Sequence, residues 1–168
     1  VLYTLAQDIW EKFKHGMQPI IGSFDSTCLT EKKCTNTAIA LAVSGGADSM
    51  CMAAMALKLQ QSGIITSPIH CIIIDHRLRS ESTMEAQYVS KYLSTRGLKN
   101  TVLTWEHDGK IFSNVHHKAR QIRYKLMLSF CNKHNIQFLC TAHTQNDQAE
   151  TILMHIMRGS GIKGIAGI

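Results

Sequence analysis

Short runs of largely apolar residues alternate with longer segments of helical pattern along most of this chain. The apolar runs predict strands at residues 39–43, 69–75, 101–105 and 138–142. The segments between and after them predict helices at residues 48–61, 82–96, 113–135 and 146–157. Strands that are apolar throughout, rather than at alternate positions, are typical of a parallel sheet buried on both faces. The pattern therefore predicts an α/β fold, a parallel sheet with helices on both faces.

Several local signals suggest where segments begin and end. Ser82 and Glu85 have the spacing of a capping box, and Gly97 is a typical helix stop. Ser113 is a candidate cap for the third long helix. An amphipathic spacing in the first residues predicts a short helix, followed by a loop rich in Gly, Ser and Thr. We therefore divide the chain into an N-terminal helix and loop, residues 1–36, and a domain, residues 37–168.

Composition narrows the function classes. No apolar run approaches the ~20 residues that span a bilayer, and the N-terminal segment has no signal-peptide pattern, so we expect a cytoplasmic protein without membrane contact. The 6 cysteines form no C-x-x-C pair, which favours reduced core cysteines over disulfides or metal ligands. The 9 histidines show no H-E-x-x-H spacing. The net charge of +6 fits an RNA partner, but it fits a generic basic protein equally well.

A glycine-containing loop follows the first predicted strand and opens a helix. Its residues are Ser44, Gly45, Gly46, Ala47, Asp48 and Ser49. The two glycines permit a tight turn and close approach of an anion, and the exposed amides at the helix start attract phosphate. The loop lacks the lysine of a P-loop, which suits chemistry at the α-phosphate with pyrophosphate leaving, that is, adenylation. Asp48 is a candidate magnesium ligand or loop orienter. The alternative is a turn that merely joins strand to helix.

Four further segments, taken with this loop, carry a family resemblance. They are D-H-R-L-R with the following S…E-A at residues 75–86, A-R-x-x-R-Y at 119–124, T-A-H-T-Q-N-D-Q-A-E-T at 141–151, and R-G-S-G-x-x-G-I-x-G-I at 158–168. The set resembles the tRNA(Ile)-lysidine synthetases of the N-type ATP pyrophosphatase, or PP-loop, superfamily. The resemblance implies a Rossmann-like, adenine nucleotide alpha hydrolase-like fold. Thr144 and Asn146 depart from the family's usual His and Asp.

The resemblance also implies an activity. It implies a carbon–nitrogen ligase that uses ATP, Mg²⁺ and free L-lysine to form lysidine at the wobble cytidine of an isoleucine tRNA with a C-A-U anticodon. The similarity runs from about residue 39 to residue 168. We expect the family's C-terminal tRNA-binding domains, and the end of its catalytic domain, to lie outside these residues. A homodimer is compatible with the resemblance.

The motifs assign roles to particular side chains. Asp147 and Glu150, spaced i and i+3 on a predicted helix, could bind the lysine ammonium, and His143 could orient lysine or transfer a proton. The alternatives are acids that complement a helix start and a structural histidine. Arg120 and Arg123 could stabilise the adenylate or bind tRNA phosphate, the alternative being a solvated basic face.

The residues at the second predicted strand end are expected near the ligand as well. Asp75 and His76 follow the apolar run 69–74, and Asp75 could touch ribose or metal. Three other functions share some of these features. They are a tRNA 2-thiolation enzyme, which the cysteine pattern disfavours, a non-catalytic nucleotide- or RNA-binding module, and an amidotransferase-type synthetase for a small molecule.

Overall fold

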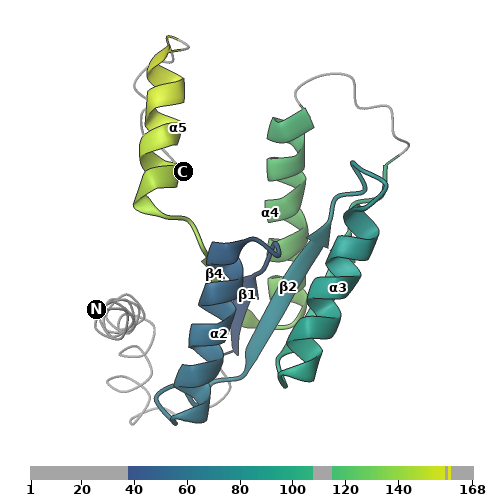
Figure 1. Ribbon diagram of the computed structural model, residues 1–168, viewed down its shortest axis with the longest axis vertical. Helices are drawn as coiled ribbons and strands as arrows, with labels where there is room; N and C mark the ends of the chain where they lie inside the picture. Colours follow the sequence, from purple (N-terminus) through teal and green to yellow (C-terminus); the bar gives the residue numbers. More distant parts are fainter. Residues whose placement is uncertain (1–37, 108–114, 158, 160–168) are drawn as a thin grey trace.

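The computed structural model describes residues 38–107, 115–157 and 159 (Figure 1). The strands are β1 (Ala38–Ala42), β2 (Ile69–Asp75), β3 (Lys99–Thr104) and β4 (Ile136–Thr141). The helices are α2 (Ala47–Gln61), α3 (Ser82–Thr95), α4 (Val115–Lys133) and α5 (Gln145–Met157). The predicted opening helix, the loop at 14–36, the Ser113 cap and the glycine-rich end from residue 160 lie outside the described residues.

The four strands form one parallel sheet in the order β3-β2-β1-β4. The chain runs outward from β1 through β2 to β3 and then returns to place β4 on the other side of β1. The strand order therefore reverses between β1 and β4. In open parallel sheets, ligands bind outside the carboxyl ends of the strands at such a reversal. The topology thus locates the site before any side chain is considered.

Both faces of the sheet are buried, as the apolar runs predict. Ile39 and Leu41 of β1 pack with α2 and α3 in one cluster, whereas the residue between them, Ala40, packs with α4 on the opposite face. Figure 1 shows α2 in front of the sheet and α4 behind it. Because alternate residues of a strand point to opposite faces, burial of both faces favours apolar side chains at successive positions.

The predicted capping box at α3 is wrong. Glu81 occupies the N-cap position with helical dihedral angles and makes no side-chain cap bond. Ser82 Oγ instead accepts a hydrogen bond from the Arg79 amide at 3.3 Å, and Glu85 pairs with the Arg79 guanidinium at 2.9 Å. A hydrogen bond ties the start of α3 to the end of β2: Thr83 Oγ1 donates to the buried Asp75 carboxylate at 2.8 Å. The predicted stop at Gly97, with φ of 81°, is confirmed.

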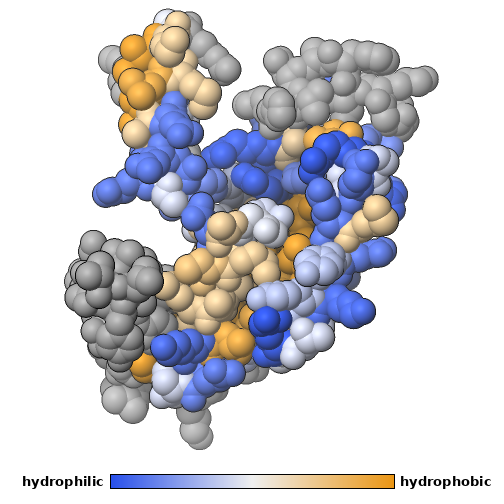
Figure 2. Space-filling model, viewed as in Figure 1, coloured by the Kyte–Doolittle hydropathy of each residue, from blue (hydrophilic) through white to orange (hydrophobic). Residues whose placement is uncertain are grey.

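Helix α5 projects away from the sheet (Figure 1) and has no buried residue. Leu153, Met154, Ile156 and Met157 are exposed, and they form the apolar patch on the upper left of Figure 2. No helix within the described ranges combines the length and apolar character needed to cross a bilayer.

Candidate active site

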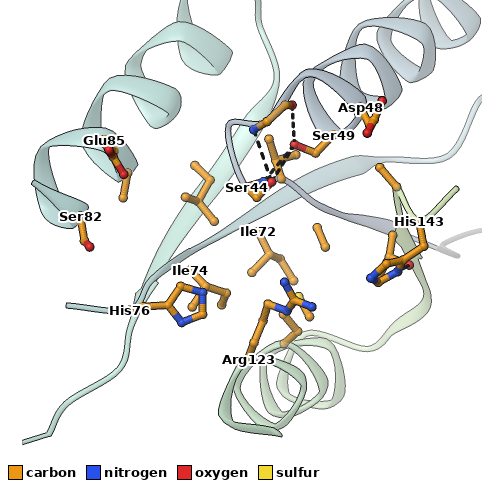
Figure 3. Close-up of a pocket in the computed structure, with 18 of the residues that line it drawn as sticks. Ser44, Asp48, Ser49, Ile72, Ile74, His76, Ser82, Glu85, Arg123 and His143 are labelled. Atoms are coloured by element: carbon orange, nitrogen blue, oxygen red, sulfur yellow. Dashed lines mark hydrogen bonds between the residues drawn. The ribbon is translucent and has the colours of Figure 1, made fainter. Parts of the chain in front are cut away.

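A cavity of about 340 Å³ opens at the carboxyl ends of β1, β2 and β4 (Figure 3). Its walls come from the loop after β1, the start of α3, the middle of α4 and the segment after β4. Ile72, Ile73 and Met127 contribute apolar surface, and polar side chains converge from the loops. The volume lies in the range of small-molecule sites, and the place is the one that the strand order predicts.

The turn of the loop requires glycine at one position only. Gly45 has φ of 86°, and a Cβ there would lie 2.8 Å from Cγ2 of Val89 on α3. Gly46 has φ of −70°, and a Cβ there would meet Ser44 Oγ at an ordinary 3.5 Å. The prediction that both glycines shape the turn therefore holds for Gly45 alone. At Gly46 the missing side chain matters only where a ligand approaches the backbone.

The two loop serines hold the loop in shape. Ser49 is buried; its hydroxyl donates to the Gly46 carbonyl at 2.9 Å and accepts from the Ser44 amide at 3.1 Å. The two serine Oγ atoms lie 3.1 Å apart (Figure 3). The first-turn amides of α2, which include Ala47 and Asp48, have no intrahelical acceptor and carry the positive end of the helix dipole. The backbone can therefore bind an anion here.

Asp48 carries a carboxylate in the same first turn of α2 as these amides. It is exposed in the first turn of α2 and lines the cavity. Among the described residues, no group of three or more His, Cys, Asp or Glu side chains is arranged to hold a metal ion. Magnesium commonly binds through one or two carboxylates together with substrate phosphates. A single carboxylate beside a phosphate loop fits that mode.

Arg123 and His76 point into the cavity from α4 and from the end of β2 (Figure 3). Burial lowers the pKa of His76, and the neighbouring Arg123 charge lowers it further. His76 Nδ1 is buried, and none of the described residues gives it a hydrogen-bond partner. Asp75 is only 2% exposed and does not line the cavity. Its carboxylate instead accepts hydrogen bonds from the Arg77 amide at 3.0 Å and from the Thr83 hydroxyl. Its carboxylate shapes the turn after β2.

His143 stands at the end of β4, where it lines the cavity. Its Nδ1 lies 2.9 Å from Thr141 Oγ1, which fixes the ring. Burial lowers the pKa of His143, and the charges of Arg120 and Arg123 act in the same direction. The imidazole is therefore neutral at neutral pH, and one ring nitrogen can accept a proton.

Asp147 both lines the cavity and caps a helix. Its Oδ2 accepts hydrogen bonds from the Thr144 amide at 2.6 Å and the Thr144 hydroxyl at 2.8 Å, and Thr144 Oγ1 accepts from the Asp147 amide at 3.3 Å. These reciprocal bonds form a capping box, with Thr144 as the N-cap of α5. The bonds from Thr144 lower the pKa of Asp147. The departure from the family motif at residue 144 is therefore a good capping residue.

The structure brings only part of the predicted set together. Ser44, Asp48, Arg123, His143 and Asp147 surround one cavity. Gly46 and Ser49 of the predicted loop line the cavity as well, whereas Gly45, Ala47 and Asp75 do not. Glu150 is exposed one turn further along α5, and Arg120 lines an adjoining hollow. Sequence reasoning assigned no role to Thr141 or Tyr124. The only signal for Tyr124 was its place at the end of the A-R-x-x-R-Y motif.

A glycine loop between a parallel strand and a helix, at a reversal of strand order, defines a nucleotide-binding α/β domain. Residues 20–168 match the PP-loop domain family, and the chain belongs to that family. The chain is 38% identical over 129 residues to the tRNA(Ile)-lysidine synthase of Anaplasma marginale, covering 77% of this chain and 27% of that protein. It is 34% identical over 158 residues to that of Rickettsia bellii, covering 94% and 34%.

The chain thus spans about a third or less of the length of these relatives. Among solved structures, the U34-tRNA thiolase NcsA from Methanococcus maripaludis with its [4Fe-4S] cluster is similar, with a TM-score of 0.66 and 19% identity. The alignment covers 91% of this chain and 53% of the thiolase. At this identity the likeness supports the fold, the parallel sheet covered on both faces.

Proposed function

We propose that the protein is a tRNA(Ile)-lysidine synthetase, an ATP-dependent carbon–nitrogen ligase. The observation that carries the proposal is the convergence of the loop, Arg123, His143 and Asp147 on one cavity at the strand reversal. The identity to tRNA(Ile)-lysidine synthases supports the same substrates: isoleucine tRNA with a C-A-U anticodon, ATP and L-lysine. The predicted domain division, a homodimer and a cytoplasmic location remain part of this proposal.

The first step activates the base. The wobble cytidine O2 attacks the α-phosphorus of ATP; an oxygen–phosphorus bond forms, the bond to the bridging oxygen breaks, and pyrophosphate leaves. The first-turn amides of α2 bind the departing pyrophosphate. Arg123 balances charge on the α-phosphate. Asp48 would hold Mg²⁺, which when bound neutralises phosphate charge.

The second step attaches lysine. The deprotonated side-chain amine attacks C2 of the activated base; a carbon–nitrogen bond forms, the carbon–oxygen bond breaks, and AMP leaves with the oxygen. Asp147 Oδ2 is engaged by Thr144, so Oδ1 is the oxygen that receives the lysine ammonium. Glu150 guides the ammonium from the next turn of α5. His143, held neutral, accepts the proton that the amine loses.

Three of the four described cysteines are poor sources of a reactive thiolate. Burial raises the pKa of Cys71 to about 11 and also raises the pKa values of Cys131 and Cys140. Sulfur transfer needs an accessible thiolate, whose formation such burial opposes. Cys51 is exposed on α2 but does not line the cavity, and Cys28 and Cys34 lie outside the described residues. This observation ranks 2-thiolation behind lysidine formation.

The test incubates the full-length protein with ATP, labelled lysine and the isoleucine tRNA. We expect label in the tRNA together with AMP and pyrophosphate. Asp48→Asn should lose pyrophosphate release, whereas Asp147→Asn should release pyrophosphate but transfer lysine poorly. Glu106→Gln is the control, because Glu106 is exposed, pairs with Arg77 at 2.6 Å and does not line the cavity. ATP binding without either product would indicate a nucleotide-binding module, and sulfur transfer from cysteine would indicate a thiolase.

A further inference from the structure

A second hollow adjoins the cavity on the outer side of His143. The two share Thr141 and His143, so a ligand in one can reach a ligand in the other. The second hollow is lined by Arg120, Tyr124, Thr141, His143, Thr144, Gln145 and Gln148. The described residues that line it include no Asp or Glu, so a lysine ammonium finds no carboxylate partner there. The chemistry offered is an aromatic ring, amide groups and a cation.

Tyr124 forms a fixed platform in this hollow. Part of its side chain packs against the core cluster between α4 and the sheet. The guanidinium carbons of Arg120 and Arg123 each lie 5.5 Å from the ring centroid. One arginine faces the second hollow and the other faces the cavity. The ring therefore lines the second hollow, with an arginine of that hollow and an arginine of the cavity both near it on α4.

Helix α4 continues the hollow with a surface of one charge sign. Its residues, Val115–Lys133, include five Lys or Arg and no Asp or Glu. A third hollow shares Arg120 and Tyr124 and runs on past Lys125, Ser129 and Asn132. Exposed cations without interspersed acids attract a polyanion, and the hydroxyl and amide groups can donate to phosphate oxygens. The face therefore resembles a track for a nucleic-acid backbone.

We propose that this face binds single-stranded RNA, with one unstacked base resting on Tyr124. The inference rests on the proposed function and locates the tRNA in it. The base stacks on the Tyr124 ring, and the Gln145 amide can both donate to and accept from a base edge. Arg120 and Lys125 bind the flanking phosphates. The base then lies next to His143, at the entrance to the cavity that receives ATP.

Two features favour RNA over other ligands. A membrane surface would need apolar side chains beside the cations, but most side chains around the second and third hollows are polar or charged. An acidic protein could pair with the cations but would not use a flat ring framed by amides. Stacking on an aromatic ring beside a basic groove is the usual mode for single-stranded nucleic acid.

The test uses the full-length protein and an anticodon stem-loop RNA that carries C-A-U, with affinity measured by fluorescence anisotropy. Tyr124→Leu should weaken RNA binding roughly 5- to 150-fold, the range for losing one base–aromatic stack. Tyr124→Phe keeps the ring and should bind RNA as tightly as the parent. ATP affinity should be unchanged in both. Tyr92→Leu is the matched control, since Tyr92 is also half-buried, with the Arg96 guanidinium carbon 3.5 Å from its ring centroid on α3.

A second variant tests the backbone track without touching the core. Lys125→Met removes an exposed cation of the track, and Lys91→Met removes an exposed cation of α3. A plot of log affinity against log salt concentration has a negative slope. Lys125→Met should make this slope shallower by about one, and Lys91→Met should leave it unchanged. Lys125→Met therefore tests whether this face binds RNA even if Tyr124→Leu fails to fold.

The outcomes separate the inference from the proposed function. RNA binding that is equal in the parent, Tyr124→Leu and Lys125→Met would overturn the inference and leave lysine ligation intact. An equal loss in Tyr124→Leu and Tyr92→Leu would also overturn it, because the loss would then reflect folding. A parent protein that binds ATP but neither binds nor modifies the tRNA would overturn the proposed function, and the inference with it.

Discussion

Replacing Gly45 by alanine tests whether the turn before α2 depends on a missing side chain. At φ of 86°, a left-handed conformation, a residue with a Cβ costs about 1–3 kcal/mol. The new Cβ would also lie 2.8 Å from Val89 Cγ2, so the loop or α3 must move. Forcing an extra methyl into packed surroundings costs about 1–3 kcal/mol more. We therefore expect a total loss of roughly 2–6 kcal/mol from the unfolding free energy.

Gly97→Ala separates the two contributions. Gly97 has a similar φ of 81°, but a Cβ there would meet no atom of the described part of the chain within 4 Å. Gly97→Ala should therefore lose only the unfolding free energy that the left-handed backbone conformation costs. Gly45→Ala should be less stable than Gly97→Ala by about 1–3 kcal/mol, roughly 2–12 °C in midpoint temperature. Denaturant unfolding measures the difference, and calorimetric titration measures ATP affinity.

Only Gly45→Ala should weaken ATP binding, because its turn borders the cavity. Combining it with Val89→Ala removes the close contact, so a double-mutant cycle should give a favourable coupling energy. Equal stability and equal ATP affinity in Gly45→Ala and Gly97→Ala would refute the argument. The turn would then tolerate a side chain, and the contact with α3 would have no energetic consequence.

Four further outcomes are expected. Ser49→Ala should lower the unfolding free energy by about 1–3 kcal/mol, because the Ser44 amide loses its acceptor; an unchanged unfolding curve would contradict this. Thr144→Ala removes the capping hydroxyl, so the opening free energy of the first turn of α5 should fall by about 1 kcal/mol and its amide hydrogens should exchange faster. Thr144→Ser keeps a hydroxyl and should show no such change. Burial and the Arg123 charge lower the pKa of His76 in the folded protein. As pH falls, the unfolded state therefore takes up this proton before the folded state does. The contribution of His76 to the free energy of unfolding is therefore fully present above pH ~6.5 and declines below it. The midpoint temperature of unfolding should therefore fall between about pH 7.5 and pH 5.5, and it should fall less in His76→Gln than in the parent. The same pH profile in both proteins would contradict this role for His76. With its pKa raised to about 11, Cys71 should resist alkylation at neutral pH while exposed Cys51 reacts, which mass spectrometry of the labelled protein would check.

The sheet could be predicted because burial on both faces leaves a strong local pattern. Ile72 and Ile73 point to opposite faces, and both are nearly inaccessible, so the middle of β2, residues 71–74, is an uninterrupted apolar run. The ends of the strands were harder. β3 begins at Lys99, two residues before the prediction, because Asn100 is a polar strand residue whose side-chain amide donates to Ser94 Oγ at 2.9 Å. A polar residue with such partners carries no strand signal in the sequence.

The candidate site was predictable at its loops but not in its detailed geometry. The glycine loop and His143 reach the cavity as expected, because both follow strands that end at the same sheet edge. The spacing of Ser82 and Glu85 suggested a cap, yet the Arg79 backbone and side chain bind both residues. The same kind of spacing at Thr144 and Asp147 forms a true capping box. Spacing alone cannot distinguish these cases, because the competing partner comes from the preceding turn.

The contact between Gly45 and α3 has a mechanical consequence. Ser82 and Glu85, at the start of α3, line the cavity, and Val89, one turn later, rests on the turn at Gly45. A helix transmits displacement along its axis as a stiff rod. A shift of the α3 start by an incoming nucleotide would therefore press on, or withdraw from, the backbone that holds the phosphates, and the two walls would adjust together.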